Sequence, residues 1–404
     1  MTSPELLCPA GDMDCLRAAL RFGADAVYVG GPRLQLRAAN AGFTMDELAH
    51  AVKETHALGR RLYVTVNAFP TNDELEALGD YAQGLFALGV DAAIVADLGA
   101  VAVMRKAAPH LPIHVSTQAN CLNWAAATAW YELGASRVVL AREMTLEQIG
   151  QLRAHTPAAL ELEAFVHGAM CMAWSGRCMI SAYLTGRSAN RGGCTQSCRW
   201  RYHLVEEKRP GEFFPVEEDD RGTTILSSHD LNCLDFLDRI AAAGVTSFKI
   251  EGRMKSPYYV ATVTNAYRLR LDRLAKGPAS PEFLALLQRE LDAVSHRTYA
   301  SGFYFGEMRC HAPDDGVYRQ DCVFSGVVRE RLDGGRVRVQ LRNPIRRGDV
   351  LEVLSPGSLG RTLVAEGLTT PDGKTLEQVV EPMVLFDMDA PPELAGGDML
   401  RKRV

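Results

Sequence analysis

The sequence predicts a (β/α)8 barrel of the TIM type, with a long cysteine-rich insertion after strand seven and a small C-terminal all-β domain. Between residues 5 and 250, short β-like runs alternate with helical stretches, and eight such units predict parallel strands that close into a barrel. Four helical stretches end alike, with a glycine just before the next strand, as in ALRFGADAVYV and LFALGVDAAIV. From Val317 onward, short alternating runs are separated by turn residues, a pattern typical of a β barrel or sandwich.

The alternative for the first part of the chain is an open doubly wound sheet. No G-x-G-x-x-G motif follows the first predicted strand, which weakens the dinucleotide-binding version of that fold. The expected strands of the barrel are Glu5–Cys8, Ala26–Val29, Leu62–Val66, Ala92–Val95, Ile113–Thr117, Arg137–Leu140, Leu160–Val166 and Ser247–Ile250.

The sequence also predicts the domain boundaries. We expect a barrel domain over residues 1–312, which contains the insertion at about residues 167–228, and a β-barrel-like domain over residues 317–404. Before strand eight, a helix is expected over Leu231–Ala243, capped by Ser228 or Asp230, with Cys233 packed in the core. Further helices are expected over 258–275 and near 281–295, and a turn-rich linker near 313–316.

Polar residues collect where the predicted strands end, which is where the active sites of such barrels lie. Because side chains alternate along a strand, Lys249, Glu251 and Arg253 are expected to share one face, and Phe248 and Ile250 the other. The same alternation pairs Thr65 with Asn67 and Ser116 with Gln118. The full expected set at the barrel mouth is Asn67, Ser116, Gln118, Arg142, Glu143, His167, Lys249, Glu251 and Arg253. Any one of these could instead be a structural partner of a buried charge.

The insertion begins at His167 and contains Cys171, Cys178, Cys194 and Cys198, spaced C-x6-C-x15-C-x3-C. It is rich in Gly, Ser, Arg and Asn, so it is expected to be a long functional loop. Clustered thiolates bind zinc or iron–sulfur clusters, and the spacing predicts one of these. The alternatives are two disulfides or thiols that never meet.

Composition limits the class of protein. The chain has 404 residues and a net charge of −5, which does not suggest a general nucleic-acid binder but leaves room for local basic patches. No run of about 18 apolar residues and no secretory signal are found, so we expect a cytoplasmic protein without a membrane span. Cytoplasmic cysteines are expected to stay reduced unless they bind metal.

Several long motifs resemble the family catalogued as U32 peptidases, and the resemblance covers most of residues 5–310. The C-terminal β runs resemble one branch of that family, the tRNA 5-hydroxyuridine modification proteins. The motifs are ELLCPAGD, GADAVYVG, HGAMCMAWSGRCMISAYLTGR, CTQSCRW and SFKIEGRMKSPYYVA. The resemblance implies prephenate-dependent hydroxylation of the wobble uridine of tRNA to 5-hydroxyuridine. It also implies a 4Fe-4S cluster on the four cysteines, with Cys233 as the alternative to Cys198.

If the co-substrate is an anion such as prephenate, the residues at the barrel mouth can be assigned expected roles. His167, Lys249 and Glu251 are the candidates for catalysis. Arg253, Arg142, Asn67 and Gln118 are the candidates for substrate binding, because arginine offers a bidentate fork to carboxylates. A simpler possibility is that Lys249 and Glu251 only neutralise each other across the barrel.

The tRNA anticodon loop is the expected partner. The RNA-binding candidates are Arg199, Trp200, Arg201, Arg336, Arg338, Arg342, Arg346 and Arg347. An aromatic residue between arginines suits an unpaired base, and an arginine-rich strand face suits phosphates. The alternative for the C-terminal arginines is a solvated strand face.

Other functions stay open within the family. Relatives hydroxylate a ubiquinone precursor or 23S rRNA, and the family name implies a collagenase-like peptidase. Neither G-x-S-x-G nor H-E-x-x-H occurs, although Cys171 and His167 could form a cysteine–histidine pair. A non-catalytic iron–sulfur scaffold and a requirement for a second U32-type subunit are further alternatives.

Overall fold

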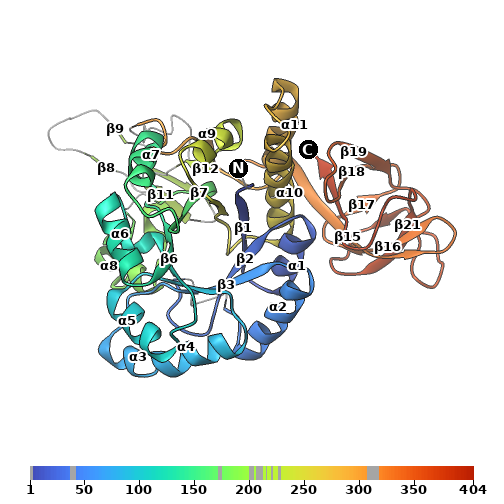
Figure 1. Cartoon of the computed structure of the whole chain (residues 1–404). Coiled ribbons are helices and arrows are strands. Elements are labelled where there is room, and N and C mark those ends of the chain that lie inside the picture. The colour runs from blue at the N-terminus through green and yellow to red at the C-terminus, as the bar shows by residue number, and fades with distance from the viewer. Residues whose placement is uncertain are drawn as a thin grey trace. The chain divides into compact units, whose positions relative to one another are not determined.

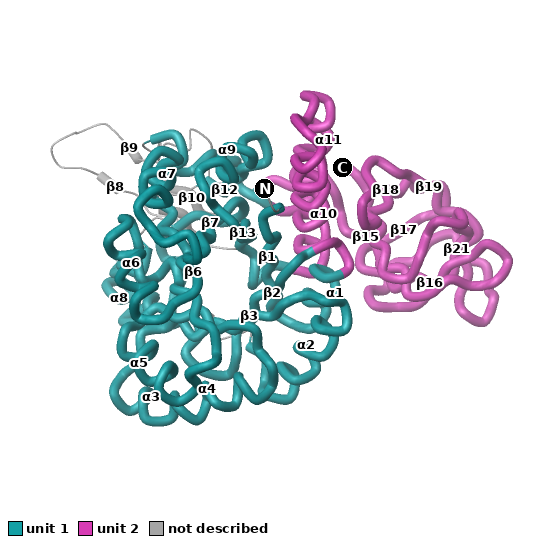
Figure 2. The backbone as a smooth tube through the Cα atoms, viewed as in Figure 1, with its two compact units in different colours: residues 1–20, 24–255, 296–318 teal, residues 21–23, 256–295, 319–404 magenta. Residues whose placement is uncertain are grey.

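The computed structural model describes residues 3–36, 42–171, 175–199, 204–205, 213–214, 216–219, 222–225, 229–306 and 318–404. The chain divides into two compact units (Figure 2). Unit 1 contains residues 1–20, 24–255 and 296–318, and unit 2 contains residues 21–23, 256–295 and 319–404. The domain boundary predicted at residues 312–317 lies outside the described residues.

Unit 1 is a closed barrel of parallel strands (Figure 1), and all eight strands predicted from the sequence are present. The last strand pairs in parallel with both the first and the seventh, which closes the ring. The strands are β1 Glu5–Ala10, β2 Ala26–Gly30, β3 Arg61–Val66, β4 Ala92–Val95, β5 Ile113–Val115, β6 Ala135–Val139, β7 Glu161–Ala169 and β13 Ser247–Ile250. The predicted (β/α)8 fold is therefore confirmed.

Helices alternate with these strands and surround the barrel (Figure 1). The repeated glycine endings have the expected geometry, because Gly23, Gly89, Gly134 and Gly244 all have positive φ. The helices are α1 Met13–Arg21, α2 Met45–Ala57, α3 Asn72–Glu76, α4 Leu78–Ala87, α5 Leu98–Ala107, α6 Trp124–Glu132, α7 Leu146–Ala154 and α9 Leu237–Ala242. Within the part of the chain that is described, no helix is long and apolar enough to cross a membrane.

The connection from β7 to β13 contains short elements. They are α8 Ile180–Thr185, the 3-10 turns η2 Ala189–Arg191 and η3 Ser197–Arg199, the paired strands β8 Leu204–Val205 and β9 Phe213–Phe214, and the paired strands β10 Val216–Asp219 and β11 Gly222–Ile225. A further 3-10 turn, η1 Thr117–Ala119, follows β5.

The predicted helix over Leu231–Ala243 is wrong in its first half. Asp230–Asn232 forms β12, which pairs antiparallel with the end of β7 and parallel with β14, Tyr299–Ala300. A 3-10 turn, η4 Leu234–Phe236, precedes α9. Cys233 therefore lies between a strand and a turn, where it is fully buried, so its predicted place in the core is correct. Ser228, one of the two predicted caps, lies outside the described residues.

Unit 2 contains the helices α10 Pro257–Leu274 and α11 Pro281–Asp292, each with proline at its start and a serine N-cap. Its sheet has the order β19-β18-β22-β15-β16-β21, and β17 pairs with β20. The strands are β15 Cys322–Leu332, β16 Arg336–Leu341, β17 Ile345–Arg346, β18 Val350–Leu354, β19 Arg361–Val364, β20 Gln378–Val379, β21 Leu385–Asp389 and β22 Met399–Arg403. Thr369 adds isolated antiparallel bridges to Thr375 and Asp387.

A candidate active site at the barrel mouth

A cavity of about 240 Å³ opens at the C-terminal ends of the barrel strands. Its floor is made by inward-facing side chains from several strands, and its rim by residues of the loops that follow them. The floor residues are Tyr28, Thr65, Ile94, Val139, Phe165 and Lys249. Most of these floor side chains are apolar or aromatic and a few are polar, which is the usual composition of a small-molecule site.

Most of the mouth residues predicted from the sequence line this one cavity. They are Asn67, Ser116, Gln118, Arg142, Glu143, Lys249, Glu251 and Arg253. The expected alternation is also present, because Phe248 and Ile250 are fully buried and neither lines the cavity. Parallel strands that end at one edge of the barrel thus bring together residues that are nearly 190 positions apart in the sequence.

Arg142 holds Glu251 at the cavity wall. Its guanidinium lies 3.3 Å from the Glu251 carboxylate, donates to the Ala169 carbonyl oxygen at 2.8 Å, and stacks 3.8 Å from the centre of the Phe165 ring. The Glu251 side chain is about one-fifth exposed. These contacts present one carboxylate to the cavity in a fixed orientation.

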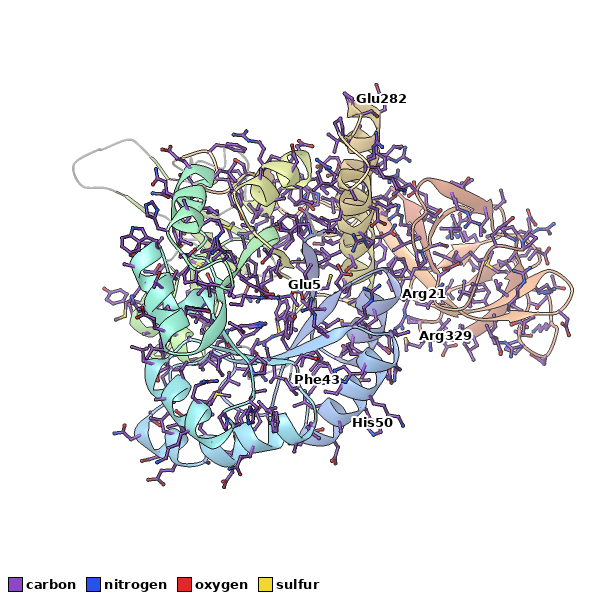
Figure 3. The ribbon with its side chains drawn as sticks, in the orientation of Figure 1. Glu5, Arg21, Phe43, His50, Glu282 and Arg329 are labelled. Carbon is purple, nitrogen blue, oxygen red and sulfur yellow. The ribbon has the colours of Figure 1, made fainter. Side chains whose placement is uncertain are left out.

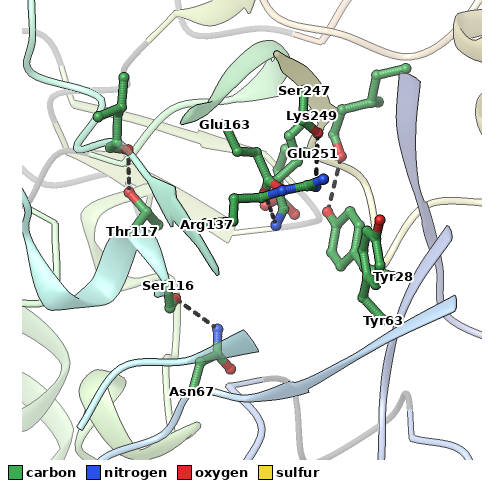
Figure 4. A network of polar contacts seen from close by, with 12 residues as sticks. Tyr28, Tyr63, Asn67, Ser116, Thr117, Arg137, Glu163, Ser247, Lys249 and Glu251 are labelled. Atoms are coloured by element: carbon green, nitrogen blue, oxygen red, sulfur yellow. Dashed lines mark hydrogen bonds and ion pairs between the residues drawn. The ribbon is translucent and has the colours of Figure 1, made fainter. Parts of the chain in front are cut away.

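Lys249 does not pair with Glu251, which corrects the simpler possibility stated above. Its ammonium group lies 2.7 Å from Glu163 on β7 and 4.4 Å from the centre of the Tyr28 ring (Figure 4). Glu163 is completely buried and also contacts Arg137 on β6 at 3.0 Å. Lys249 is thus held beneath the cavity by a buried carboxylate.

The charged network continues to Glu5 on β1, which lies inside the ring of strands (Figure 3). Arg137 contacts the Glu5 carboxylate at 2.6 Å, and Ser247 donates to it at 2.8 Å. Burial alone would raise the pKa of Glu5, but the guanidinium of Arg137, helped by Arg61, lowers it overall. This network was not predicted from the sequence. A usable signal was present, because Glu5, Arg137 and Glu163 are charged residues that each lie in an otherwise largely apolar strand segment.

Arg253 is nearly buried beside β2 and β3. Its guanidinium donates to the Thr65 hydroxyl at 2.6 Å, and it lines the cavity together with Lys255. The mouth therefore carries cationic groups from Arg142, Lys249, Arg253 and Lys255, alongside the carboxylates of Glu143 and Glu251. This charge balance suits an anionic ligand that meets both a fork of donors and a proton acceptor.

His167 is not among the residues that line the cavity. It is buried on β7 beside the Tyr299 ring, and burial lowers its pKa to about 3, so the imidazole is neutral near pH 7. The next residue, Gly168, has φ +103°, and a Cβ there would lie 2.5 Å from the Glu251 carbonyl oxygen. Gly168 therefore lets the end of β7 approach the backbone that carries Glu251.

The four predicted cysteine ligands, Cys171, Cys178, Cys194 and Cys198, all line the cavity. Cys233 does not, and burial raises the pKa of its thiol well above the ordinary value. Four thiols around one cavity supply the donor set that an iron–sulfur cluster takes. In the ranges that the structure describes, no group of three or more His, Cys, Asp or Glu side chains is arranged to hold a metal ion.

Specific contacts fix the cysteine segment over the barrel. Glu143 accepts hydrogen bonds from the backbone and hydroxyl of Ser175, at 2.8 and 3.0 to 3.1 Å. Asn190 and the backbone of Cys178 exchange hydrogen bonds of 3.0 and 3.3 Å. Arg191 pairs with Glu74 at 3.1 Å. The segment is therefore attached to the barrel near two of its cysteines.

The predicted RNA-binding residues differ in their surroundings, and two of them are not described by the structure. Arg199 ends η3, while Trp200 and Arg201 lie outside the described residues. In unit 2, Arg338 pairs with Asp387 and Glu330, Arg347 with Glu366 and Glu377, and Arg336 lies 4.0 Å from Asp389. Arg342 contacts the sulfur of Met383, and Arg346 lies on β17. Several charges of the expected RNA face are thus already neutralised by carboxylates.

The sequence matches two family descriptions, "Peptidase family U32" over residues 11–312 and "Peptidase family U32 C-terminal domain" over residues 320–401. The tRNA hydroxylation protein P of Escherichia coli is 37% identical over 410 residues, which cover 90% of this chain and 89% of that protein. The tRNA hydroxylation protein P1 of Bacillus subtilis is 35% identical and covers 99% of this chain and 94% of that protein. A collagenase of Porphyromonas gingivalis is 32% identical and covers 75% of this chain and 74% of that protein.

Proposed function

This chain belongs to peptidase family U32, and we propose that it is a tRNA-modifying enzyme that hydroxylates the wobble uridine to 5-hydroxyuridine. The observation that carries the proposal is the match to tRNA hydroxylation proteins along nearly the whole chain, the C-terminal β part included. The cavity supports it, because thiols, cationic groups and carboxylates surround one space at the barrel mouth.

In this proposal Cys171, Cys178, Cys194 and Cys198 hold a 4Fe-4S cluster. Their shared cavity favours Cys198 over the buried Cys233 as the fourth ligand. When bound, such a cluster supplies electron transfer at the edge of the site. The hydrogen bond of Ser175 to Glu143 attaches the ligand-bearing segment to the barrel mouth, and those between Asn190 and Cys178 join two parts of the segment.

Prephenate is the proposed co-substrate, and its carboxylates need cationic partners. Arg253 and Lys255 line the cavity, and Arg253 is oriented by the Thr65 hydroxyl. Arg142 is less suited to binding the ligand directly, since its guanidinium already holds Glu251 and the Ala169 carbonyl. Asn67 and Gln118 remain candidates for hydrogen bonds to the ligand or to the uracil ring.

Converting C5–H of uridine to C5–OH is a two-electron oxidation of the base. In this proposal the hydroxyl group comes from prephenate, whose C–O bond breaks and which takes up two electrons and a proton, while the C5 proton leaves the base. Glu251 is the residue we assign to that proton, because its carboxylate faces the cavity and Arg142 fixes its orientation. Lys249 supports the floor of the site from its buried pair with Glu163 and stabilises negative charge there. His167 is buried behind the wall, so we give it no part in proton transfer.

The peptidase alternative finds less support in the site. It needs an activated thiol beside a histidine, and Cys171 lines the cavity whereas His167 does not. The four-thiol donor set and the cationic groups are better explained by a cluster and an anionic small molecule.

Mass spectrometry of nucleosides from tRNA tests the proposal. A strain that lacks this protein should contain no 5-hydroxyuridine-derived nucleosides at the wobble position, and the wild-type gene should restore them. Replacing Arg253 with lysine should restore at least tenfold less product, because lysine cannot form a bidentate contact. Unchanged levels of these nucleosides in the deletion strain would contradict the proposal.

A further inference from the structure

The short helix α8 has one face in the protein and one in solvent. On its inner side Ser181 is buried, and its hydroxyl accepts a hydrogen bond from the Thr195 backbone at 3.2 Å. On the outer side Tyr183 is 88% exposed, and Met179 is 71% exposed. The helix is thus anchored through small polar residues while its aromatic ring stands in water. Packing gives no account of a tyrosine in that position.

The exposed face lies on the segment that walls the cavity. Cys178 lines the cavity, and Met179 follows it directly. After α8 the chain returns to the cavity wall at Ala189, Asn190 and Cys194. The helix also packs against η2 and η3. Tyr183 is therefore carried by the rim of the candidate active site.

The charged residues of the segment itself are all of one sign. Residues 171–201 include Arg177, Arg187, Arg191, Arg199 and Arg201 but contain no Asp, Glu or Lys, although the whole chain has a net charge of −5. Arg177 and Arg187 are exposed on either side of α8. A cationic segment with an exposed aromatic ring matches a polyanion that also offers flat apolar surfaces.

We propose that Tyr183 is a stacking platform for an unpaired base of the tRNA loop, next to the nucleotide that enters the cavity. Arg177 and Arg187 contact the phosphates that flank this base. The inference rests on the proposed function and adds the residue that positions the loop. A duplex keeps its base faces stacked internally, so the platform selects single-stranded RNA.

Binding of a synthetic anticodon stem-loop RNA to the anaerobically purified protein, measured by fluorescence anisotropy, tests the proposal. Replacing Tyr183 with alanine should weaken binding about tenfold, the size expected for loss of one base–aromatic stack. Tyr183→Trp should bind as tightly as wild type, whereas Tyr183→Leu should lose as much as the alanine variant. Phe86→Ala is the matched control, because Phe86 is a half-exposed aromatic on the barrel helix α4, and it should bind normally.

Each other outcome has a definite meaning. Wild-type affinity in Tyr183→Ala overturns the stacking role while the function proposed above stands. Wild-type affinity in Tyr183→Leu overturns the stacking role in favour of a simple apolar contact with the RNA, and a shift to smaller particles in Tyr183→Ala overturns it in favour of contact with a second copy of the chain. Absence of stem-loop binding by the wild-type protein contradicts the proposed function itself.

Discussion

Glu161 and Glu163 contact the same guanidinium from very different surroundings. Arg137 lies 2.6 Å from Glu161 and 3.0 Å from Glu163, but the Glu161 side chain is 45% exposed whereas Glu163 is completely buried. Glu163 also holds the ammonium group of Lys249. The two residues therefore form a matched pair for measuring what burial does to an ion pair.

We expect Glu163→Gln to lower the free energy of unfolding of unit 1 by about 3 kcal/mol, because it leaves two buried cations without their shared carboxylate. Glu161→Gln should cost less than about 1 kcal/mol, since water screens that pair. Urea unfolding followed by tryptophan fluorescence measures both, because Trp124, Trp130, Trp174 and Trp200, all the tryptophans of the chain, fall within unit 1. Equal losses in the two variants would contradict a stabilising role for the buried network.

At this scale, the sequence predicted which polar residues meet but not how they pair. Strand periodicity placed Lys249, Glu251 and Arg253 on one face, and all three line the cavity. The partners of Lys249 and Glu251 are Glu163 and Arg142, which come from other strands and loops. Pairing across a barrel depends on register and rotamer, which one strand's periodicity does not contain.

Among the elements, β18 and β22 of unit 2 carry a second buried charge cluster. Glu352 on β18 contacts Arg401 at 2.9 Å, Arg403 at 2.8 Å and, on α11, Arg289 at 3.0 Å. Burial alone would raise the pKa of Glu352, but the three arginines lower it from 4.5 to about 2. The folded carboxyl thus stays ionised at pH values where an unfolded one is protonated.

The sign of the pH effect follows from this lowered pKa. The stabilisation from Glu352 should be complete above about pH 4.5 and lost as the pH falls from 4.5 toward 2. The difference in unfolding free energy between wild type and Glu352→Gln should therefore be constant near neutral pH and shrink across that interval. Far-ultraviolet circular dichroism during urea unfolding measures this difference, and the tryptophan fluorescence, which reports on unit 1, separates the unfolding of unit 1 from that of unit 2. A difference that stays constant down to pH 2 would contradict the lowered pKa.

Elements with strong local patterns were predictable. The strands Ala92–Val95 and Ser247–Ile250 agree with prediction at both ends, because apolar runs between glycine-ended helices leave little choice. The helix predicted from Leu231 failed because β7 continues past β13 and pairs with β12. The leucines at helical spacing pack in the core in either conformation, and the tertiary pairing decided between them.

At the scale of the whole molecule, positive charge is concentrated in one segment of an otherwise acidic chain. The net charge is −5, yet residues 171–201 contain five arginines and no acidic residue. Arg191 of this segment pairs with Glu74, and in the β part Arg336, Arg338 and Arg347 all pair with carboxylates. The sequence alone suggested Arg199, Trp200 and Arg201 of the first region, and the arginines of the β part, as RNA contacts. Counting arginines in a sequence does not show which of them are neutralised by acidic residues from other strands.

The cavity at the barrel mouth is where the four cysteine thiols and the proposed anion site meet, and the proposed function depends on it. The sequence predicted the four cysteines, but their choice over Cys233 rests on the structure, since all four line the cavity and Cys233 is buried away from it. Local spacing cannot settle which thiols of a long loop come together in space.

Iron and acid-labile sulfide in anaerobically purified protein test this claim most directly. We predict about four irons per chain for the wild type and for Cys233→Ala, and loss of most iron and sulfide in Cys198→Ala. Circular dichroism should show that both variants keep the wild-type fold. Stoichiometric zinc without sulfide, or a cluster that survives Cys198→Ala but not Cys233→Ala, would contradict the account.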